Sequence, residues 1–219
     1  MTKISRKLLS GDNCHIFICG LTQSGKSYFA HRALAGLRDP VLYCNIQGEE
    51  VPRGFVTVHT SRADLGQLID LLQHGAKVNL VFDDMGSGYN YTIADIIARL
   101  MVLNFSRSKP VYIAIDECHL LSGKGLKAAR VAATAGLKKG IRLVCITQRV
   151  SLCDKTLYTQ AFEHYIFYIP VGDGGYMKTK GIDYNKCLAW WSSQGDIKNK
   201  FGHSYMYFNG YELTGKKGI

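Results

Sequence analysis

Short apolar runs alternate with longer amphipathic segments along most of the chain. The apolar runs predict strands at 15–19, 41–46, 55–59, 77–82, 111–115, 141–146 and 164–169. Helical periodicity predicts helices at about 26–37, 61–73, 92–105 and within 120–139. Apolar strands separated by helices imply βαβ crossovers and burial of both sheet faces. The pattern therefore predicts an α/β fold with a mainly parallel central sheet and helices on both faces.

The composition of the chain changes after about Pro170, where glycine and aromatic residues become frequent. Asn209-Gly210 lies between two β-prone runs and predicts a hairpin with a type I′ turn, which needs positive φ at both central positions. We expect the nearby aromatic side chains to pack against the sheet edge rather than to stack on bases; they are Trp190, Trp191, Tyr205, Tyr207 and Phe208. We expect one domain over 1–219, with a core at about 12–170 and a small C-terminal aromatic hairpin extension at about 171–219.

Composition indicates a folded chain outside the secretory route. Of the 219 residues, 47% are hydrophobic and 20% are charged, which suits a globular protein with a core. No apolar stretch approaches the roughly 18 residues that a bilayer span requires, and the basic start lacks the apolar region of a signal peptide. We therefore expect a protein that is not integral to a membrane. The seven cysteines form no CxxC pair, so buried reduced thiols are favoured over disulfides or zinc ligands.

The charge balance favours a polyanionic partner. The chain has 27 Lys and Arg against 17 Asp and Glu, a formal charge of +10. The stretch 105–150 contains nine basic residues and only two acidic ones, Asp116 and Glu117. Such an excess is typical of proteins that bind nucleic acid, although charge alone does not establish that partner.

One motif carries specific chemistry. The run Gly20-Leu21-Thr22-Gln23-Ser24-Gly25-Lys26-Ser27 fits G-x-x-x-x-G-K-[ST] and lies between a predicted strand and a predicted helix. The glycines let backbone N–H groups surround the β-phosphate, Lys26 bridges the β- and γ-phosphates, and Ser27 ligates Mg²⁺. The motif predicts a P-loop that binds ATP with Mg²⁺. The expected nucleotide contacts are Gly20, Leu21, Thr22, Gln23, Ser24, Gly25, Lys26, Ser27 and Tyr28.

Two carboxylate pairs compete for the metal and the general base. Asp116 would hold Mg²⁺ through water and Glu117 would polarise the attacking water, while Asp83 and Asp84 offer a similar pair. We favour the first pair because its strand, 111–115, is more completely apolar, as expected of a central neighbour of the strand before the P-loop. Glutamate also reaches further than aspartate toward a water. Asp83 and Asp84 would then cap the following turn or face the substrate channel.

The strand 141–146 ends in Thr147-Gln148-Arg149. If it neighbours the strand 111–115, Gln148 lies beside the γ-phosphate and senses or orients the nucleophilic water. The alternative is that Thr147 and Gln148 only hydrogen-bond a loop.

Taken together, GLTQSGKS at 20–27, VYIAIDECH at 111–119 and GIRLVCITQR at 140–149 closely resemble the HerA/FtsK superfamily of DNA-pumping ATPases, over about residues 12–170. The small core resembles the genome-packaging ATPases of membrane-containing icosahedral viruses with double jelly-roll capsids. The resemblance implies a RecA-like P-loop NTPase fold, a homo-oligomeric ring, commonly a hexamer, and ATP bound between subunits that drive double-stranded DNA through the pore. It also implies Walker A roles for Lys26 and Ser27, Walker B roles for Asp116 and Glu117, and a sensor role for Gln148.

One position departs from that family's pattern. Members often carry an arginine just after the first glycine of the segment before the sensor strand, where it reaches the neighbour's γ-phosphate, and Leu137 stands there in this chain. Lysine can replace such an arginine only as a point charge. The candidates for a residue that reaches the neighbouring subunit's γ-phosphate are Arg149 and Arg130, followed by Arg142 and Lys138.

We expect DNA contacts through phosphates, because a motor must hold any sequence. The best candidate is a glycine-flanked loop at 122–127 that carries Lys124 and Lys127 and follows the catalytic strand directly. Lys138 and Lys139 are further candidates.

The leading functional hypothesis is an ATP-driven double-stranded DNA translocase that packages a viral genome into a preformed capsid. Its partners would be capsid, vertex or membrane proteins of a virion, and its location the host cytoplasm or the packaging vertex. One alternative is a Zot-like morphogenesis ATPase of filamentous phages, whose members usually carry a transmembrane segment. Another is a P-loop kinase for a small molecule or nucleotide, but no segment shows the arginine-rich lid that such a kinase needs. A scaffold that binds ATP without turnover would have no need of Glu117.

Overall fold

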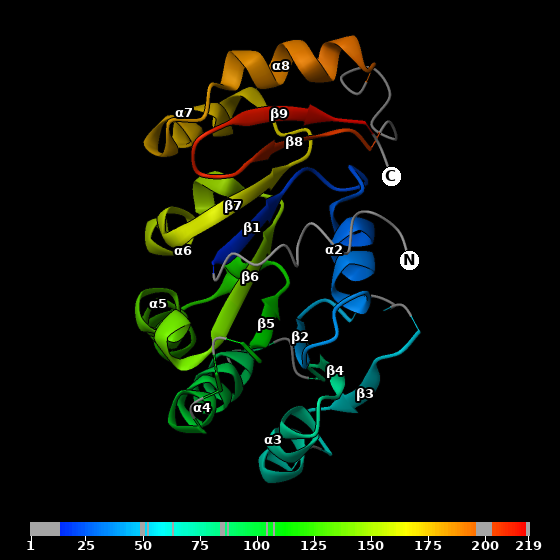
Figure 1. Ribbon diagram of the computed structural model, residues 1–219, viewed down its shortest axis with the longest axis vertical. Coiled ribbons are helices and arrows are strands. Elements are labelled where there is room, and N and C mark those ends of the chain that lie inside the picture. Colours follow the sequence, from blue (N-terminus) through cyan, green and yellow to red (C-terminus); the bar gives the residue numbers. More distant parts are fainter. Residues whose placement is uncertain are drawn as a thin grey trace.

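The computed structural model describes residues 14–48, 51, 53–62, 64–83, 86, 88–103, 105–106, 108–195 and 203–217. The strands in these ranges form one nine-stranded sheet in the order β3-β4-β2-β5-β6-β1-β7-β8-β9 (Figure 1). The parallel strands are β1 (His15–Cys19), β2 (Val41–Asn45), β3 (Val56–His59), β4 (Lys77–Val81), β5 (Val111–Ile115), β6 (Ile141–Thr147) and β7 (Ala161–Ile166). The strand β8 (Tyr205–Phe208) pairs antiparallel with β7 and with β9 (Leu213–Lys216). The predicted mainly parallel sheet is confirmed.

Helices cover both faces of the sheet, but unequally. They are α2 (Lys26–Ala35), α3 (Leu65–Gln73), α4 (Gly88–Leu103), α5 (Gly123–Ala135), α6 (Lys155–Gln160), α7 (Gly174–Met177) and α8 (Tyr184–Ser193). Side chains alternate along β5, so that Ile113 faces one side and Tyr112 the other. The Ile113 side packs against apolar side chains from α3 through α8, while the Tyr112 side packs against α2, which stands apart from the other helices in Figure 1. None of the described helices is long and apolar enough to cross a membrane.

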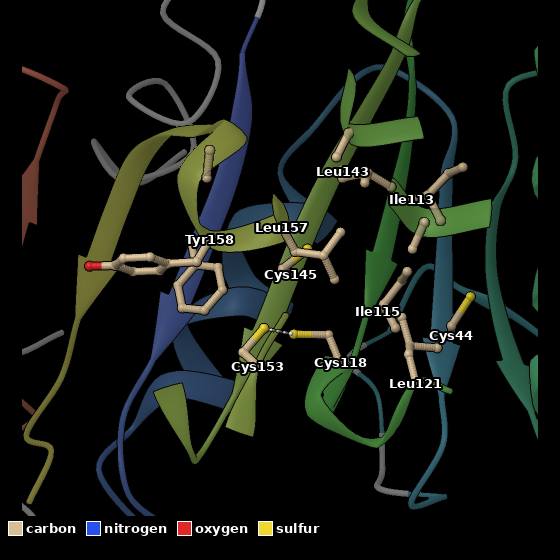
Figure 2. Packing of buried hydrophobic residues seen from close by; sticks show 14 of the residues in the cluster. Cys44, Ile113, Ile115, Cys118, Leu121, Leu143, Cys145, Cys153, Leu157 and Tyr158 are labelled. Carbon is tan, nitrogen blue, oxygen red and sulfur yellow. Dashed lines mark hydrogen bonds between the residues drawn. The ribbon is translucent and has the colours of Figure 1, made fainter. Parts of the chain in front are cut away.

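The core on the Ile113 side contains a group of thiols between β5, β6 and α6. Figure 2 shows Cys118, Cys145 and Cys153 packed near Leu157 and Ile115. The Sγ atoms of Cys118 and Cys153 are 3.5 Å apart. All seven cysteines are buried, as predicted for reduced thiols. Burial also raises the pKa of the Cys44 thiol to about 12, because the thiolate form would lose its hydration. These cysteines behave as small apolar core residues.

The expectation that β5 directly neighbours the P-loop strand β1 is wrong. The strand β6 lies between them and pairs in parallel with both, Ile113 with Leu143 and Phe17 with Cys145. Both β5 and β6 are buried along their whole length. Apolar character therefore does not indicate which of the two strands lies next to β1. Gln148 follows β6, and β6 pairs with β5, as the predicted role of Gln148 beside the γ-phosphate requires.

The segment 122–127 is not a loop. The helix α5 begins at Gly123, and the side chain of Asn90 in α4 accepts a hydrogen bond from the Ser122 N–H at 2.9 Å and donates one to the Ser122 hydroxyl at 3.2 Å. A Cβ on Gly125 would collide with Asn90, so this glycine permits the close approach of α4 and α5. Here tertiary packing prevails over the turn preference of glycine.

The predicted C-terminal hairpin is confirmed, but its turn differs. Phe208 pairs with Leu213, which leaves a four-residue loop at 209–212. Gly210 has φ 84, whereas Asn209 is not among the described residues with positive φ, so the type I′ turn is wrong. The Asn209 Oδ1 atom instead accepts hydrogen bonds from the N–H groups of Tyr211 at 3.1 Å and Glu212 at 2.7 Å. This side-chain cap stabilises the wider loop.

The aromatic residues of the extension pack onto the sheet, as expected. Trp191 is fully buried with its ring centroid 5.5 Å from that of Tyr168, and Tyr205 lies 5.1 Å from Phe29 in α2. Gly215 in β9 lies against the indole of Trp190. The hairpin thus extends the sheet beyond β7, and α8 lies over β8 and β9 in Figure 1.

Candidate nucleotide-binding and catalytic site

Three chain segments meet at one edge of the sheet because β1, β5 and β6 run parallel. Gly20 follows β1, Asp116 follows β5, and Gln148 follows β6. The Gly20 N–H donates to the Thr147 carbonyl at 3.2 Å, which joins the start of the P-loop to the end of β6. The carboxyl edge of a parallel sheet is the usual position of a ligand site in α/β proteins.

The P-loop has the backbone conformation of an anion-binding loop. Gln23 and Gly25 adopt left-handed conformations, with φ 66 and φ 92, and α2 begins at the next residue, Lys26. This geometry turns successive N–H groups toward one point in front of the helix. A Cβ on Gly20 would lie 2.5 Å from the Ser24 Oγ atom, and that buried hydroxyl has no hydrogen-bond partner in the described part of the chain. The left-handed loop backbone and the Ser24 hydroxyl fit a phosphate group.

Glu117 lies at the centre of the site. Its Oε1 atom is 3.8 Å from the Lys26 Nζ atom, and both side chains are almost fully buried. The Gln148 backbone N–H donates to Glu117 Oε2 at 3.2 Å, and the Gln148 side-chain amide donates to Oε1. Gln148 Oε1 in turn accepts from the Thr22 hydroxyl at 2.6 Å. One glutamine thus joins the P-loop to Glu117.

His119 belongs to this site, although motif reasoning missed it. Its Nδ1 atom lies 3.2 Å from Glu117 Oε2 and 3.0 Å from the Thr147 hydroxyl. The position two residues after Glu117 was the only hint in the sequence, because a short 3-10 helix (Cys118–Leu120) turns the imidazole back. Glu117 itself has a left-handed backbone, φ 49 and ψ 48, which is rare for a residue with a side chain. Such strain is common at functional positions.

The pKa of Glu117 is set by opposing effects. Burial raises it, but the hydrogen bond with His119, the charge of Lys26 and the hydrogen bond from Gln148 together outweigh burial. The net result is a pKa below the ordinary value of 4.5. The carboxylate is therefore ionised at neutral pH and able to accept a proton.

Asp116 is held by a second network that the sequence did not reveal. The Tyr43 hydroxyl donates to Asp116 Oδ2 at 3.0 Å, and the His31 Nε2 atom lies 2.8 Å from the same hydroxyl. Burial lowers the pKa of His31 to about 4, so its imidazole is neutral at pH 7 and can donate its Nε2 proton to Tyr43. A tyrosine within an apolar strand and a histidine on the buried face of α2 were the only signals.

Replacing Tyr43 by phenylalanine is expected to leave Asp116 and His31 without this partner. The free energy of unfolding should fall by about 1–3 kcal/mol, the usual cost of removing one partner of a buried hydrogen bond. The Mg²⁺ concentration for half-maximal ATPase activity should rise, because the carboxylate loses its orientation. A matched control is Tyr112→Phe, which removes the hydroxyl partner of Arg142 at the other end of β5. An equal change in Mg²⁺ dependence in both variants would contradict the role of Tyr43.

The residues proposed for Mg²⁺ fit that ion only together with a nucleotide. Asp116 and Ser27 supply a carboxylate and a hydroxyl, which are hard oxygen ligands. The described residues contain no group of three or more His, Cys, Asp or Glu side chains arranged to hold a metal. Mg²⁺ is commonly bound by one or two protein ligands plus phosphate oxygens and water, which matches this sparse donor set.

The competing carboxylate Asp83 lies away from the P-loop. It follows β4, which β2, β5 and β6 separate from β1. Its Oδ2 atom accepts from the Ser61 N–H at 2.9 Å and its Oδ1 atom lies 2.8 Å from His59 Nδ1. The hydrogen bonds from Ser61 and His59 hold the pKa of Asp83 well below its usual range. Asp83 therefore caps a turn, and its partner Asp84 lies outside the described residues.

The candidate trans-acting side chains lie in different environments. Arg142 is buried and donates to the Tyr112 hydroxyl, so it cannot reach another subunit. Arg130 is half exposed and makes two hydrogen bonds to Asp154 Oδ2, at 3.1 and 2.6 Å. Arg149 is exposed at the end of β6, next to Gln148. Arg149 and Arg130 thus retain accessible guanidinium groups, and Lys138 is an exposed alternative.

The four lysines proposed for DNA lie at opposite ends of α5. Lys124 and Lys127 are exposed in its first turns, with Lys124 Nζ 5.0 Å from the centroid of the Tyr91 ring. Lys138 and Lys139 follow its last turn, in a 3-10 helix (Gly136–Lys139) just before β6. A helix of 13 residues is about 20 Å long, so the two pairs form separate basic patches. Lys124 and Lys127 are on the edge that carries the P-loop.

The chain is similar in fold to solved P-loop ATPases. No protein-family model and no curated protein matches its sequence. The genome packaging NTPase B204 of Sulfolobus turreted icosahedral virus 2, in complex with AMPPCP, superposes with a TM-score of 0.62 at 13% identity, over 95% of this chain and 100% of B204. B204 of Sulfolobus turreted icosahedral virus, a DNA-packaging ATPase, gives 0.60 at 17% identity, over 95% and 99% of the two chains. The conjugation coupling protein TcpA of pCW3 gives 0.52 at 12% identity, over 95% of this chain and 61% of TcpA. The predicted P-loop NTPase fold is confirmed, and it is the fold that these packaging and conjugation proteins share.

Proposed function

We propose that this chain hydrolyses ATP and uses the free energy to move double-stranded DNA, as a motor that packages a viral genome into a preformed capsid. The observation that carries the proposal is the position of Glu117, an ionised, buried carboxylate 3.8 Å from the P-loop lysine and bonded to Gln148. Nucleotide complexes of the structurally similar B204, a genome packaging NTPase, support nucleotide binding at this loop.

The residues divide the work of hydrolysis. P-loop N–H groups and Lys26 bind the phosphates, and bound Mg²⁺, held by Ser27 and Asp116, would supply charge neutralisation on the phosphate oxygens. Glu117 accepts the proton of the attacking water, Gln148 orients that water, and His119 holds the carboxylate. The Lys26 ammonium also lies 3.8 Å from the Glu117 carboxylate. Phosphate binding would move Lys26 toward the phosphates, so that the Glu117 carboxylate could bind the attacking water.

Coupling to DNA would pass through α5. The short helix Cys118–Leu120 connects Glu117 to α5, and Tyr89 of α4 donates to the Leu120 carbonyl at 2.6 Å. A movement of Glu117 would reach Lys124 and Lys127 through this short, hydrogen-bonded segment. A homo-oligomeric ring, commonly a hexamer in the family that the sequence resembles, would place Arg149 or Arg130 at a neighbour's nucleotide.

The test is the steady-state ATPase rate with and without long double-stranded DNA across protein concentrations. We expect DNA to stimulate the rate and the rate to rise cooperatively with protein concentration, because sites shared between subunits form only in the ring. A rate that is linear in protein and indifferent to DNA would overturn the motor and favour a monomeric P-loop kinase.

Two matched variants identify the DNA-facing surface when DNA affinity is measured across a range of salt concentrations. Lys124→Ala with Lys127→Ala should weaken DNA binding for all sequences and reduce the slope of log affinity against log salt by about 2, since each phosphate contact contributes about 0.9. Lys138→Ala with Lys139→Ala removes the same charge from the other end of α5 and should change the slope less. The reverse result would place DNA at the edge that carries Lys138.

A further inference from the structure

The C-terminal extension returns to the P-loop. Ile166, the last residue of β7, pairs with Met206 in the antiparallel strand β8. The residues just before β8 therefore lie at the carboxyl edge of the sheet, where β1 leads into the P-loop. His203 contacts Gly25 there: a Cβ built on Gly25 would lie 2.6 Å from the His203 Nδ1 atom and 3.0 Å from its Cγ atom.

His203 is part of a cavity in front of the P-loop. The cavity has a volume of about 400 Å³, within the range of roughly 300–1,000 Å³ that is usual for ligand pockets. Its lining consists of Thr22, Gln23, Gly25, Lys26, Ser27, Tyr28 and His203. The phosphate-binding loop and the first turn of α2 thus form most of the lining. The C-terminal extension adds His203 to it.

The direction of the cavity indicates which end of a nucleotide it takes. Glu117 lies beside Lys26, and Gln148 bonds to Thr22. Neither Glu117 nor Gln148 is among the residues that line the cavity. The γ-phosphate must face Glu117, because that is where the attacking water is activated. The nucleoside end of the same nucleotide therefore extends into the cavity, toward Tyr28 and His203.

The two rings at this end suit a nucleobase. Tyr28 is 55% exposed, and the Arg32 guanidinium lies 5.6 Å from the centroid of its ring and donates to its hydroxyl at 3.1 Å. The His203 Nδ1 atom is buried and has no hydrogen-bond partner in the described part of the chain. His203 also has φ 52, a left-handed conformation that is costly for a residue with a side chain. A buried nitrogen without a partner and a strained backbone are both common where a ligand completes the site.

We propose that His203 is a nucleotide-binding residue: with Tyr28 it contacts the base and sugar of the bound purine nucleotide, while the P-loop holds the phosphates. This inference rests on the proposed ATPase function. It gives the C-terminal extension a role in the site besides packing. Gly25 has two roles, because it adopts the left-handed turn of the P-loop and leaves room for the imidazole.

The test compares two probes by calorimetry, a non-hydrolysable ATP analogue and inorganic tripolyphosphate. His203→Ala should weaken binding of the analogue about tenfold, since base–ring contacts commonly carry that much affinity, and should change tripolyphosphate binding less than twofold. His203→Phe keeps a ring against Gly25 and removes the nitrogen, so a loss of about fivefold is expected. Unchanged binding of the analogue to both variants would overturn the inference, and so would an equal loss for both probes.

Controls separate this inference from the proposed function. Tyr211→Ala alters an 88% exposed ring at the tip of the same hairpin and should leave both affinities unchanged. If the unmodified protein binds neither probe, the ATPase proposal itself fails. If it binds both probes and the His203 variants bind them equally well, only the role of His203 fails. Should His203→Ala not fold, His203→Phe alone decides, by the same comparison of the two probes.

Discussion

Replacing Glu117 by glutamine is expected to lower the rate of ATP hydrolysis by about 10²–10⁴-fold, the usual contribution of a general base. Glutamine keeps the size of the side chain and can still bond Gln148, but it cannot accept the proton of the attacking water. ATP affinity should stay nearly unchanged, because the P-loop and Lys26 provide the phosphate contacts. Single-turnover hydrolysis and equilibrium binding of a non-hydrolysable analogue, measured on the same protein, separate the two effects.

A matched control for this substitution is Asp83→Asn. It also converts a carboxylate after a parallel strand into an amide, but at β4, with three strands between it and β1. Its turnover should equal that of the unmodified protein. Normal turnover in Glu117→Gln would move the general base to Asp84.

Replacing Lys26 by alanine is expected to weaken ATP binding by about 10- to 100-fold, because hydrogen bonds to charged groups contribute about 1.5–3 kcal/mol. Turnover should fall by a further 10²–10³-fold, as for other donors that stabilise charge in a transition state. The variant also leaves Glu117 without its buried cation, so the protein without nucleotide should unfold at a lower temperature. Calorimetry with and without ATP measures both the affinity and the unfolding temperature.

Lys77→Ala is the matched control for Lys26. The Lys77 ammonium donates to the carbonyl of Ala35, the last residue of α2, whereas Lys26 is the first residue of that helix. The two lysines thus lie at opposite ends of α2. Loss of Lys77 should lower the unfolding temperature without changing ATP affinity. If both variants lose affinity equally, the effect of Lys26 is one of helix stability and its role at the phosphates is contradicted.

Features that depend on neighbours in the chain were predictable from the sequence. The P-loop is one such feature, since eight consecutive residues define both its chemistry and its backbone geometry. The strands were predictable because burial on both faces requires runs such as 111–115 and 141–146 to be apolar throughout. The carboxylates after β5 were found for the same reason, because a polar pair directly after an apolar strand must lie at the sheet edge.

Features that depend on contacts between distant elements were decided only by the tertiary structure. The order β5-β6-β1 follows from crossover connections and not from apolar character, which β5 and β6 share. The segment 122–127 became helical because Asn90 of α4 binds Ser122. Contacts of this kind leave no spacing rule in the sequence.

The residues of the functional site also divide into those that the sequence determined and those that only the tertiary structure decided. The sequence by itself determined which groups can bind phosphate and accept a proton, namely Lys26 and Glu117, because their motifs are local. Only the tertiary structure decided that His119 holds Glu117 and that His203 meets the P-loop from the C-terminal extension. The physical reason is that side-chain chemistry is fixed by residue type, whereas the partner of a side chain is fixed by how strands and helices far apart in the chain pack together.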